Sequence, residues 1–348
     1  MNSSSNLSVL APSELGYVMP AEWARHTATW MAWPTIHVQW ENQSAVEQAY
    51  ADVANAIARF EPVVMLVDTG QIEVAEKLCS DNVTVLANPA DDSWMRDTGP
   101  SFIKHPETGK IAGVDWRFNC WGGYTPEYQL DAQMAIRILD HLDMEAYHSS
   151  LVLEGGAIHV DGEGTLVTTE SVVLNANRNW GMDHAQAEAE LCRATGAQKV
   201  IWLPGDPDGE TTDMTDGHVD GIMCFVEPGV VLFERDVSSE GIYARLEQEN
   251  RRALELATDA KGRKFEIIDI EVDHSAICNE DELFCSSYIN FYLPNGGLVM
   301  PNYGVAADQQ VKELLAGVFP DREIAGVDIN AIAPGGGGIH CITQQQPA

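Results

Sequence analysis

Residues 216–226 read Asp-Gly-His-Val-Asp-Gly-Ile-Met-Cys-Phe-Val, a polar loop that runs directly into an apolar strand. A polar or glycine-rich loop that opens a short strand recurs along the chain, at Asp97, Glu154, Tyr288 and Cys341. Successive members are roughly 50 to 70 residues apart, with strands and a helix between them, which indicates repeated αβ modules. Such modules can stack into an open solenoid or close into a ring. A ring would bring all five strand starts to one end of a central axis.

The segments between these loops predict alternating strands and helices. Ser44 and Glu47 predict a capping box at the start of the first clear helix, which extends to Phe60. Residues 222–226 and 230–233 are expected to pair as a hairpin. Because no linker or charge block divides the chain, we expect one α/β domain over residues 19–348, after a partly disordered N-terminal extension, residues 1–18.

Composition excludes several classes of function. The chain has 53 acidic side chains against 20 Lys plus Arg, a formal net charge of -33, which disfavours binding to nucleic acid and to anionic membranes and favours small cations. Solubility or adaptation to salt explains the same charge equally well. We see no secretion signal and no apolar run that approaches the ~20 residues of a transmembrane helix. Seven cysteines without CxxC spacing favour a reducing compartment, so we expect a cytoplasmic protein without a structural zinc site.

If the five strand starts converge, a thiol, an imidazole and three carboxylates meet at the axis: Cys341, His218, Asp97, Glu154 and Asp220. Alternation along a strand places His218 and Asp220 on one face. The same alternation turns His340 away from its neighbour Cys341. His218 is therefore the predicted base.

A thiol among several carboxylates suits one kind of electrophile. The carboxylates raise the pKa of the thiol above its free value of ~8.5, which is unproductive unless the substrate brings positive charge. A guanidinium brings that charge, binds carboxylates through its planar fork of N–H donors, and exposes its central carbon to attack from the face. The pattern therefore predicts nucleophilic catalysis on a cationic carbon.

Five separate motifs, together with MPAEW (19–23), resemble the agmatine deiminase and bacterial-type peptidylarginine deiminase family. They are WMRDTGP (94–100), LEGGAIHVDGEGT (153–165), GHVDGIMCFV (217–226), SYINFYLPNGG (287–297) and GGGGIHCITQQQP (335–347). The resemblance implies the five-bladed αβ propeller, or pentein, fold, with pseudo-fivefold symmetry around a central active site. It also implies hydrolysis of a guanidine to a urea plus ammonia, without a metal or another cofactor.

Carried over position by position, the resemblance implies a role for each motif residue. Cys341 would form an amidino thioether, and His218 would act in turn as acid and base. Asp220 and Glu154 would grip the guanidinium nitrogens, with Asp97 as a further carboxylate. The remaining substrate-binding positions would be Trp94 as a cation–π partner, Trp121, and Gly338, where many relatives carry Asn. For Arg96 we expect an ion pair that holds the Asp97 loop.

The substrate stays open between several guanidines. Segments 121–129 and 271–285 are shorter than in agmatine deiminases, so the core chemistry is better supported than agmatine itself, the precursor of N-carbamoylputrescine in putrescine biosynthesis. Alternatives are deimination of arginine residues in peptides, of another guanidino compound, or amidino transfer to an amine. A metal-dependent hydrolase would use His159, His218, Asp220 and His340, and a non-catalytic polyamine-binding protein would not need Cys341. A homodimer is left open.

Overall fold

The computed structural model describes residues 10–35, 40, 42–277 and 283–348. Within these residues the strands form five separate sheets. The first sheet has the order β15 (Gln344–Pro347), β1 (His26–Ala32), β2 (Val63–Val67) and β3 (Val83–Ala87). The next two are β4 (Ser101–Lys104), β5 (Ile111–Asp115), β6 (Glu145–His148), and β7 (Ile158–Val160), β8 (Thr165–Thr169), β9 (Lys199–Leu203). The last two are β10 (Met223–Glu227), β11 (Val230–Asp236), β12 (Glu266–Val272), and β13 (Gly297–Asn302), β14 (Glu323–Asp328).

The sheets share one plan. In the three sheets of three strands, the first two strands pair antiparallel and the third lies parallel to the second. The parallel crossovers carry the longer helices: α1 (Gln43–Ile57), α2 (Ile72–Leu78), α5 (Met134–His141), α8 (His184–Thr195), α9 (Gly241–Leu256) and α10 (Ala306–Val318). A parallel pair requires such a crossover, which explains the spacing of the repeats seen in the sequence.

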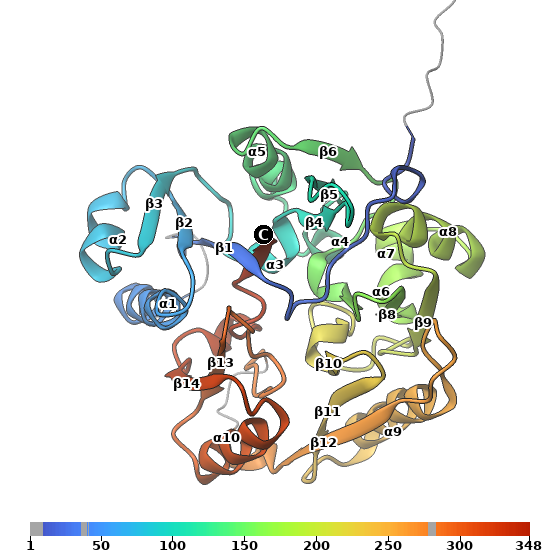
Figure 1. The fold of residues 1–348 in the computed structure, drawn as a ribbon. Helices are drawn as coiled ribbons and strands as arrows, with labels where there is room; N and C mark the ends of the chain where they lie inside the picture. Colours follow the sequence, from blue (N-terminus) through green and yellow to red (C-terminus); the bar gives the residue numbers. More distant parts are fainter. Residues whose placement is uncertain (1–9, 36–39, 41, 278–282) are drawn as a thin grey trace, which may run out of the picture.

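Figure 1 shows the five sheets following one another around a common centre, with the crossover helices on the outside. The first and last strands of the chain meet in the first sheet, where β15 pairs antiparallel with β1. Short helical segments lie between the sheets: α3 (Met95–Thr98), α4 (Cys120–Gly123), α6 (Glu170–Val173), α7 (Ala176–Asn179), and the 3-10 turns η1 (Ser13–Leu15), η2 (Asp131–Gln133), η3 (Gly155–Ala157), η4 (Val219–Gly221), η5 (His274–Ala276) and η6 (Ala333–Gly335). Several of these short segments carry the candidate catalytic side chains.

Helix α1 illustrates what local sequence predicts well and badly. Its buried stripe is the one expected from the spacing of apolar residues, with Val46, Tyr50 and Val53 fully covered. The predicted capping box of Ser44 was wrong, because the side chain of Asn42 accepts the hydrogen bond from Ala45 N and starts the helix earlier. The predicted hairpin of β10 and β11 is confirmed.

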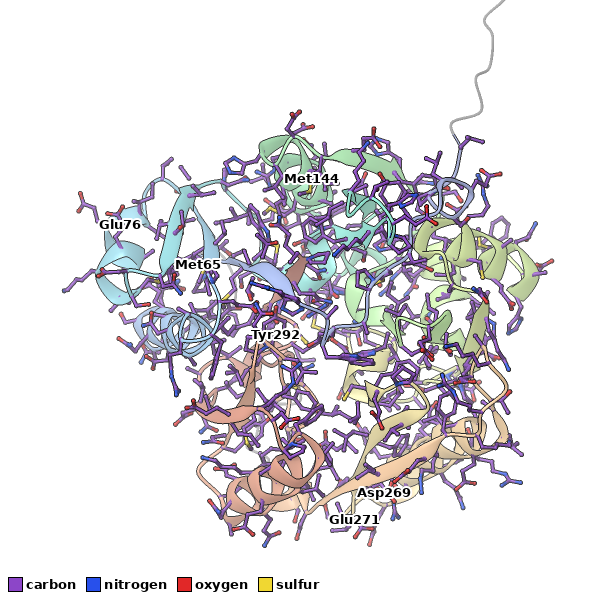
Figure 2. All side chains as sticks on the ribbon, in the orientation of Figure 1. Met65, Glu76, Met144, Asp269, Glu271 and Tyr292 are labelled. Carbon is purple, nitrogen blue, oxygen red and sulfur yellow. The ribbon has the colours of Figure 1, made fainter. Side chains whose placement is uncertain are left out.

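Apolar side chains fill the space between the sheets and their helices. In Figure 2, Met65 on β2 and Tyr292 lie inside, and both are fully buried, whereas Glu76 on α2 and Glu271 on β12 project from the exposed outer surface. Among the described residues, no helix combines the length and the apolar character that a membrane span requires.

The expected extension over residues 1–18 lies partly outside the described residues, because residues 1–9 are not described. Its last two residues pack against the fold: Tyr17 is buried, and Val18 exchanges backbone hydrogen bonds with Lys104 at the end of β4.

Candidate active site

A cavity of about 560 Å³ opens where the loops that precede the inner strands converge. Its wall includes Trp94, Asp97, Trp121, His218, Asp220 and Cys341, six of the eight predicted site residues, which come from three of the five predicted loops and from α4. Further out the wall carries two more aspartates, Asp213 and Asp236. None of the described residues that line the cavity is a lysine or an arginine. The cavity is therefore strongly acidic.

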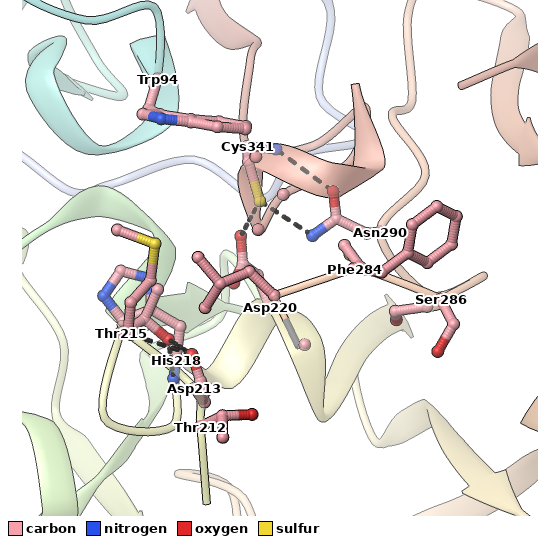
Figure 3. Close-up of a pocket in the computed structure, with 18 of the residues that line it drawn as sticks. Trp94, Thr212, Asp213, Thr215, His218, Asp220, Phe284, Ser286, Asn290 and Cys341 are labelled. Carbon is pink, nitrogen blue, oxygen red and sulfur yellow. Dashed lines mark hydrogen bonds between the residues drawn. The ribbon is translucent and has the colours of Figure 1, made fainter. Parts of the chain in front are cut away.

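Cys341 lies in a turn just before β15, not in a strand as the sequence analysis supposed. Asn290 holds this turn: its side-chain oxygen accepts from His340 N at 2.9 Å, and its Nδ2 donates to Cys341 Sγ at 3.1 Å. In the view of Figure 3 the Trp94 ring lies above the thiol, Asp220 lies below it and Asn290 lies to its right. The Asp220 Oδ2 atom is 3.9 Å from Sγ. Burial first, and then the negative charge of Asp220, raise the pKa of the Cys341 thiol well above its usual value.

The glycine run before Cys341 lets an aromatic ring approach the backbone. A Cβ atom at Gly337 would lie 2.3 Å from the Trp94 ring, and one at Gly335 would lie 2.2 Å from the Trp40 ring. Of the four glycines only Gly336 has a positive φ, 91°. The glycines are thus needed mainly because they let the Trp40 and Trp94 rings pack against the backbone, which places Trp94 beside the Cys341 thiol.

His218 is buried between two carboxylates. Its Nε2 is 3.2 Å from Glu154 Oε2, and its Nδ1 is 3.8 Å from Asp97 Oδ1. Burial lowers the pKa of His218, but the two carboxylates outweigh burial and raise it to about 9. The alternation argument that paired His218 with Asp220 was wrong, because residues 219–221 form the turn η4 instead of a strand. Both side chains nevertheless line the cavity.

Glu154 lies behind His218 and does not line the cavity. Its side chain is fully buried, and its Oε1 accepts from Arg178 Nε at 2.7 Å while Oε2 faces His218. Burial raises the pKa of Glu154, but the bond with His218 and the charge of Arg178 bring it below its usual value. This position differs from the direct grip on the substrate that the resemblance implied, since both oxygens are already engaged.

Asp97 and Asp220 expose carboxylate oxygens to the cavity from different loops. Asp97 accepts from Gly156 N and from Trp121 Nε1, both at 2.9 Å. Burial raises the pKa of Asp97. Asp220 Oδ2 lies 2.8 Å from His340 Nδ1. Burial raises the pKa of Asp220, but its bond to His340 reverses the effect and lowers it.

Known proteins resemble this chain over nearly its whole length. The family model of Porphyromonas-type peptidyl-arginine deiminase matches residues 18–347. The chain belongs to that family. The chain is 43% identical, over 97% of each chain, to a Legionella pneumophila (strain Philadelphia 1) protein described as an agmatine deiminase. It is 41% identical, over 97% of each chain, to the agmatine deiminase of Pseudomonas fluorescens (strain SBW25).

Solved structures agree with this membership. The structure described as agmatine deiminase of Enterococcus faecalis catalysing its reaction superposes on this deiminase-family chain with a TM-score of 0.91, at 32% identity and over 98% of each chain. The mixed α/β fold is therefore that of pentein-superfamily structures. The protein is accordingly a guanidine-modifying hydrolase.

Other members of the site were missed by sequence reasoning, or were placed differently by it. Asn290 stands as a polar residue inside the apolar SYINFY stretch of this deiminase-family chain, a signal that went unused. Arg178 left no local signal. Gly338 does not line the cavity; it packs behind it, where a Cβ would lie 2.7 Å from Asn290 Oδ1. The ion pair expected of Arg96 was wrong: within the described residues Arg96 donates to His340 O and to Gln345 Oε1, and no carboxylate pairs with it.

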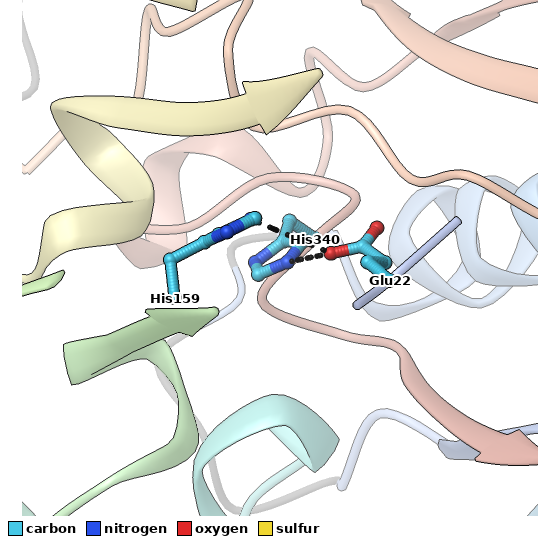
Figure 4. A group of neighbouring side chains, drawn as sticks. All are labelled: Glu22, His159 and His340. Atoms are coloured by element: carbon cyan, nitrogen blue, oxygen red, sulfur yellow. Dashed lines mark hydrogen bonds and ion pairs between the residues drawn. The ribbon is translucent and has the colours of Figure 1, made fainter. Parts of the chain in front are cut away.

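The suggested metal set does not assemble. Of its four residues, His159 and His340 come together with Glu22, and each of these three offers one ligand-type atom within 4.8 Å of the others (Figure 4). His218 is engaged elsewhere, with Glu154 and Asp97.

Gly155 sets the distance between the Glu154 loop and α3. A Cβ at Gly155 would lie 2.1 Å from the backbone oxygen of Arg96, an atom that cannot swing aside. We expect Gly155→Ala to lower the free energy of unfolding by about 1–3 kcal/mol, measured by urea denaturation. Gly317→Ala is the matched control, because Gly317 lies in α10 with open space around its Cβ position, and we expect it to be neutral or stabilising by about 0.4–1 kcal/mol. Equal losses in both variants would contradict this packing.

Proposed function

We propose that this protein hydrolyses agmatine to N-carbamoylputrescine and ammonia through a covalent amidino-cysteine intermediate. The observation that carries the proposal is the cavity itself, whose described lining combines the Cys341 thiol and His218 with four aspartates and contains no lysine or arginine. Agmatine has a guanidinium at one end and an ammonium at the other, so both of its charges suit this wall.

The guanidinium would bind between Asp97, which reaches the cavity from α3, and Asp220, which reaches it from η4. Planar N–H donors match carboxylates in a bidentate manner, and two opposed carboxylates fix the guanidinium plane. The rings of Trp94 and Trp121 line the same cavity and offer faces for the cation and the alkyl chain. This binding leaves the central carbon open to the Cys341 thiol.

The substrate supplies what the thiol lacks. In the free protein, burial and neighbouring carboxylates hold the pKa of Cys341 high and keep it protonated. A bound guanidinium neutralises Asp97 and Asp220 and adds positive charge beside Sγ, which favours the thiolate. Ionisation of the nucleophile is thereby coupled to the arrival of a cationic substrate.

The reaction then takes two symmetrical steps. The Cys341 thiolate forms a C–S bond to the guanidinium carbon. The C–N bond to one amino group breaks as protonated His218 gives its proton to that nitrogen, and ammonia leaves. Neutral His218 next takes a proton from water, and the resulting hydroxide attacks the amidino carbon. The C–S bond breaks and restores the thiolate, the added hydroxyl loses its proton to water or to the released ammonia, and the neutral urea product leaves with His218 again protonated.

A series of three guanidines of equal chain length tests how the cavity recognises the group at the end of the substrate opposite the guanidinium. We expect kcat/KM for ammonia release to be highest for agmatine, lower for butylguanidine with its neutral tail, and lowest for 4-guanidinobutanoate, with about 100-fold or more between the ends of the series. A carboxylate tail would face Asp213 and Asp236 without a lysine or arginine in the described lining to pair with. Arginine and an arginine peptide extend the series. Preference for either over agmatine would refute the assignment of substrate.

We infer further that the five sheets are the blades of a five-bladed αβ propeller with pseudo-fivefold symmetry, formed by a single domain over residues 19–348. The shared strand plan of the sheets and the pairing of β15 with β1 support this inference. The six cysteines in the described residues are free thiols, which supports action in a reducing compartment such as the cytoplasm.

A further inference from the structure

A buried imidazole lies directly behind the cavity. His340 is covered by protein, its Nδ1 is 2.8 Å from Asp220 Oδ2, and its Nε2 is 2.9 Å from Glu22 Oε2 (Figure 4). Both ring nitrogens therefore face carboxylate oxygens. Neither carboxylate can donate when ionised, so an imidazole that satisfies both must carry two protons and a positive charge.

The groups around His340 agree with that charge state. Burial and the nearby Arg96 lower the pKa of His340, but Glu22 and Asp220 outweigh them, and the net shift is upward. The carboxyl group of Glu22 is shifted the other way, to a lower pKa, by His340 and Arg96 against the effect of burial. His159 stacks on His340 with ring centres 6.2 Å apart, and burial lowers its pKa to about 4, so His159 is neutral. One of the two stacked imidazoles is thus charged.

The same Asp220 oxygen faces both His340 and the nucleophile. Oδ2 is 2.8 Å from His340 Nδ1 and 3.9 Å from Cys341 Sγ. Without a partner this carboxylate would oppose ionisation of the thiol from a few ångströms away. The backbone of His340 is also fixed, since its N–H donates to Asn290 and its carbonyl accepts from Arg96.

We propose that His340 is a positioning residue: held between Glu22 and Asp220, it fixes the Asp220 carboxylate beside the Cys341 thiol and supplies the positive charge that offsets it. This inference rests on the proposed function only in taking Cys341 as the nucleophile. It links the MPAEW segment near the N-terminus to the site, through Glu22, and it gives the histidine of the Gly-Ile-His-Cys motif a role distinct from that of His218.

The competing interpretation is a divalent metal held by Glu22, His159 and His340. Two features of the cluster oppose it. The guanidinium of Arg96 acts electrostatically on all three groups and would repel a second cation. The proton on His340 Nε2 already satisfies Glu22 at an ordinary hydrogen-bond distance of 2.9 Å.

The test measures the reactivity of the thiol without using a guanidine substrate. His340→Gln replaces the charged imidazole with an uncharged amide that can still form hydrogen bonds. The positive charge beside Asp220 is lost, so the pKa of the Cys341 thiol should rise by about one unit. The thiolate is the species that reacts. We therefore expect alkylation of Cys341 by iodoacetamide to be about tenfold slower at each pH from 6 to 9, followed by mass spectrometry of the peptide that contains Cys341. The charged or titratable groups that act on this thiol besides Asp220 include Asp97, Cys285 and Tyr50.

Two controls separate positioning from mere structural support. His159→Gln removes a buried imidazole of the same cluster that is neutral and contacts Glu22 and His340 instead of hydrogen-bonding to Asp220, and this variant should be alkylated at the wild-type rate. In an Asp220→Asn background, His340→Gln should slow alkylation by less than about twofold, because the charge that it offsets is gone. An additive effect in that background, or equal slowing in His159→Gln, would overturn the proposal. So would a stoichiometric metal in the purified wild-type protein that is lost on His340→Gln.

The thiol assay also separates this inference from the proposed function. If agmatine is not turned over but His340→Gln slows alkylation as described, the role of His340 stands and the substrate is wrong. If agmatine is turned over and alkylation is unchanged, the role of His340 is wrong and the function stands.

Discussion

Cys341→Ser is expected to lower kcat for agmatine by about 10⁴-fold or more while agmatine still binds. The hydroxyl of serine does not ionise near neutral pH, so the variant lacks the thiolate that forms the C–S bond. The carboxylates of Asp97 and Asp220 and the ring of Trp94 are unchanged and still hold the guanidinium. Ammonia release measures the first expectation, and isothermal titration with agmatine measures the second.

Cys285→Ser provides the matched control, because Cys285 is a second cysteine that lines the same cavity. Burial raises the pKa of the Cys285 thiol to about 12, so it is not ionised under the assay conditions. We expect Cys285→Ser to retain turnover within a few-fold of wild type. Loss of turnover in Cys285→Ser with activity retained in Cys341→Ser would mean that the nucleophile has been misassigned. Loss of agmatine binding in Cys341→Ser would mean that the thiol is part of the binding site itself.

The convergence of the loops was predictable because it depends on topology. A loop that opens a strand at intervals of roughly 50 to 70 residues specifies one module per interval, and a ring of such modules places equivalent loops together. The cavity wall does receive Asp97, His218, Asp220 and Cys341 from three such loops, and Asn290 from a fourth. The local argument used to choose among them was less sound, since a turn at residues 219–221 replaced the assumed strand.

The ion pairs that lie behind the cavity could not be predicted from the sequence. Arg178 reaches Glu154 from α7, and Glu22 reaches His340 from a segment 318 residues away. Each pair is created by the packing of separate modules, so neither leaves a pattern of spacing along the chain. A buried charge must be paired, however, and a fully buried Glu154 requires a partner such as Arg178. That requirement becomes visible only when burial is known.

His218→Asn is expected to lower kcat by about 10²- to 10⁴-fold, the range usual for loss of a general acid or base. The asparagine cannot give a proton to the departing amino group or take one from water. The affinity for agmatine should change little, because the two carboxylates proposed to bind its guanidinium, Asp97 and Asp220, remain. Steady-state ammonia release and agmatine titration on the same preparation separate the two effects. A kcat within tenfold of wild type would show that another group carries the proton.

The pH dependence of kcat/KM in the wild-type protein tests the role of His218 as the acid. The departing ammonia needs a protonated His218, and the pKa of His218 in the free protein is about 9, so kcat/KM should fall as pH rises through about 9. Glu154→Gln removes one of the two carboxylates that raise this pKa, and the fall should therefore move to lower pH. His218→Asn should show no fall attributable to this group. Because His218 is charged below its pKa, a wild-type profile that does not fall above pH 9 would contradict its role as the acid of the first step.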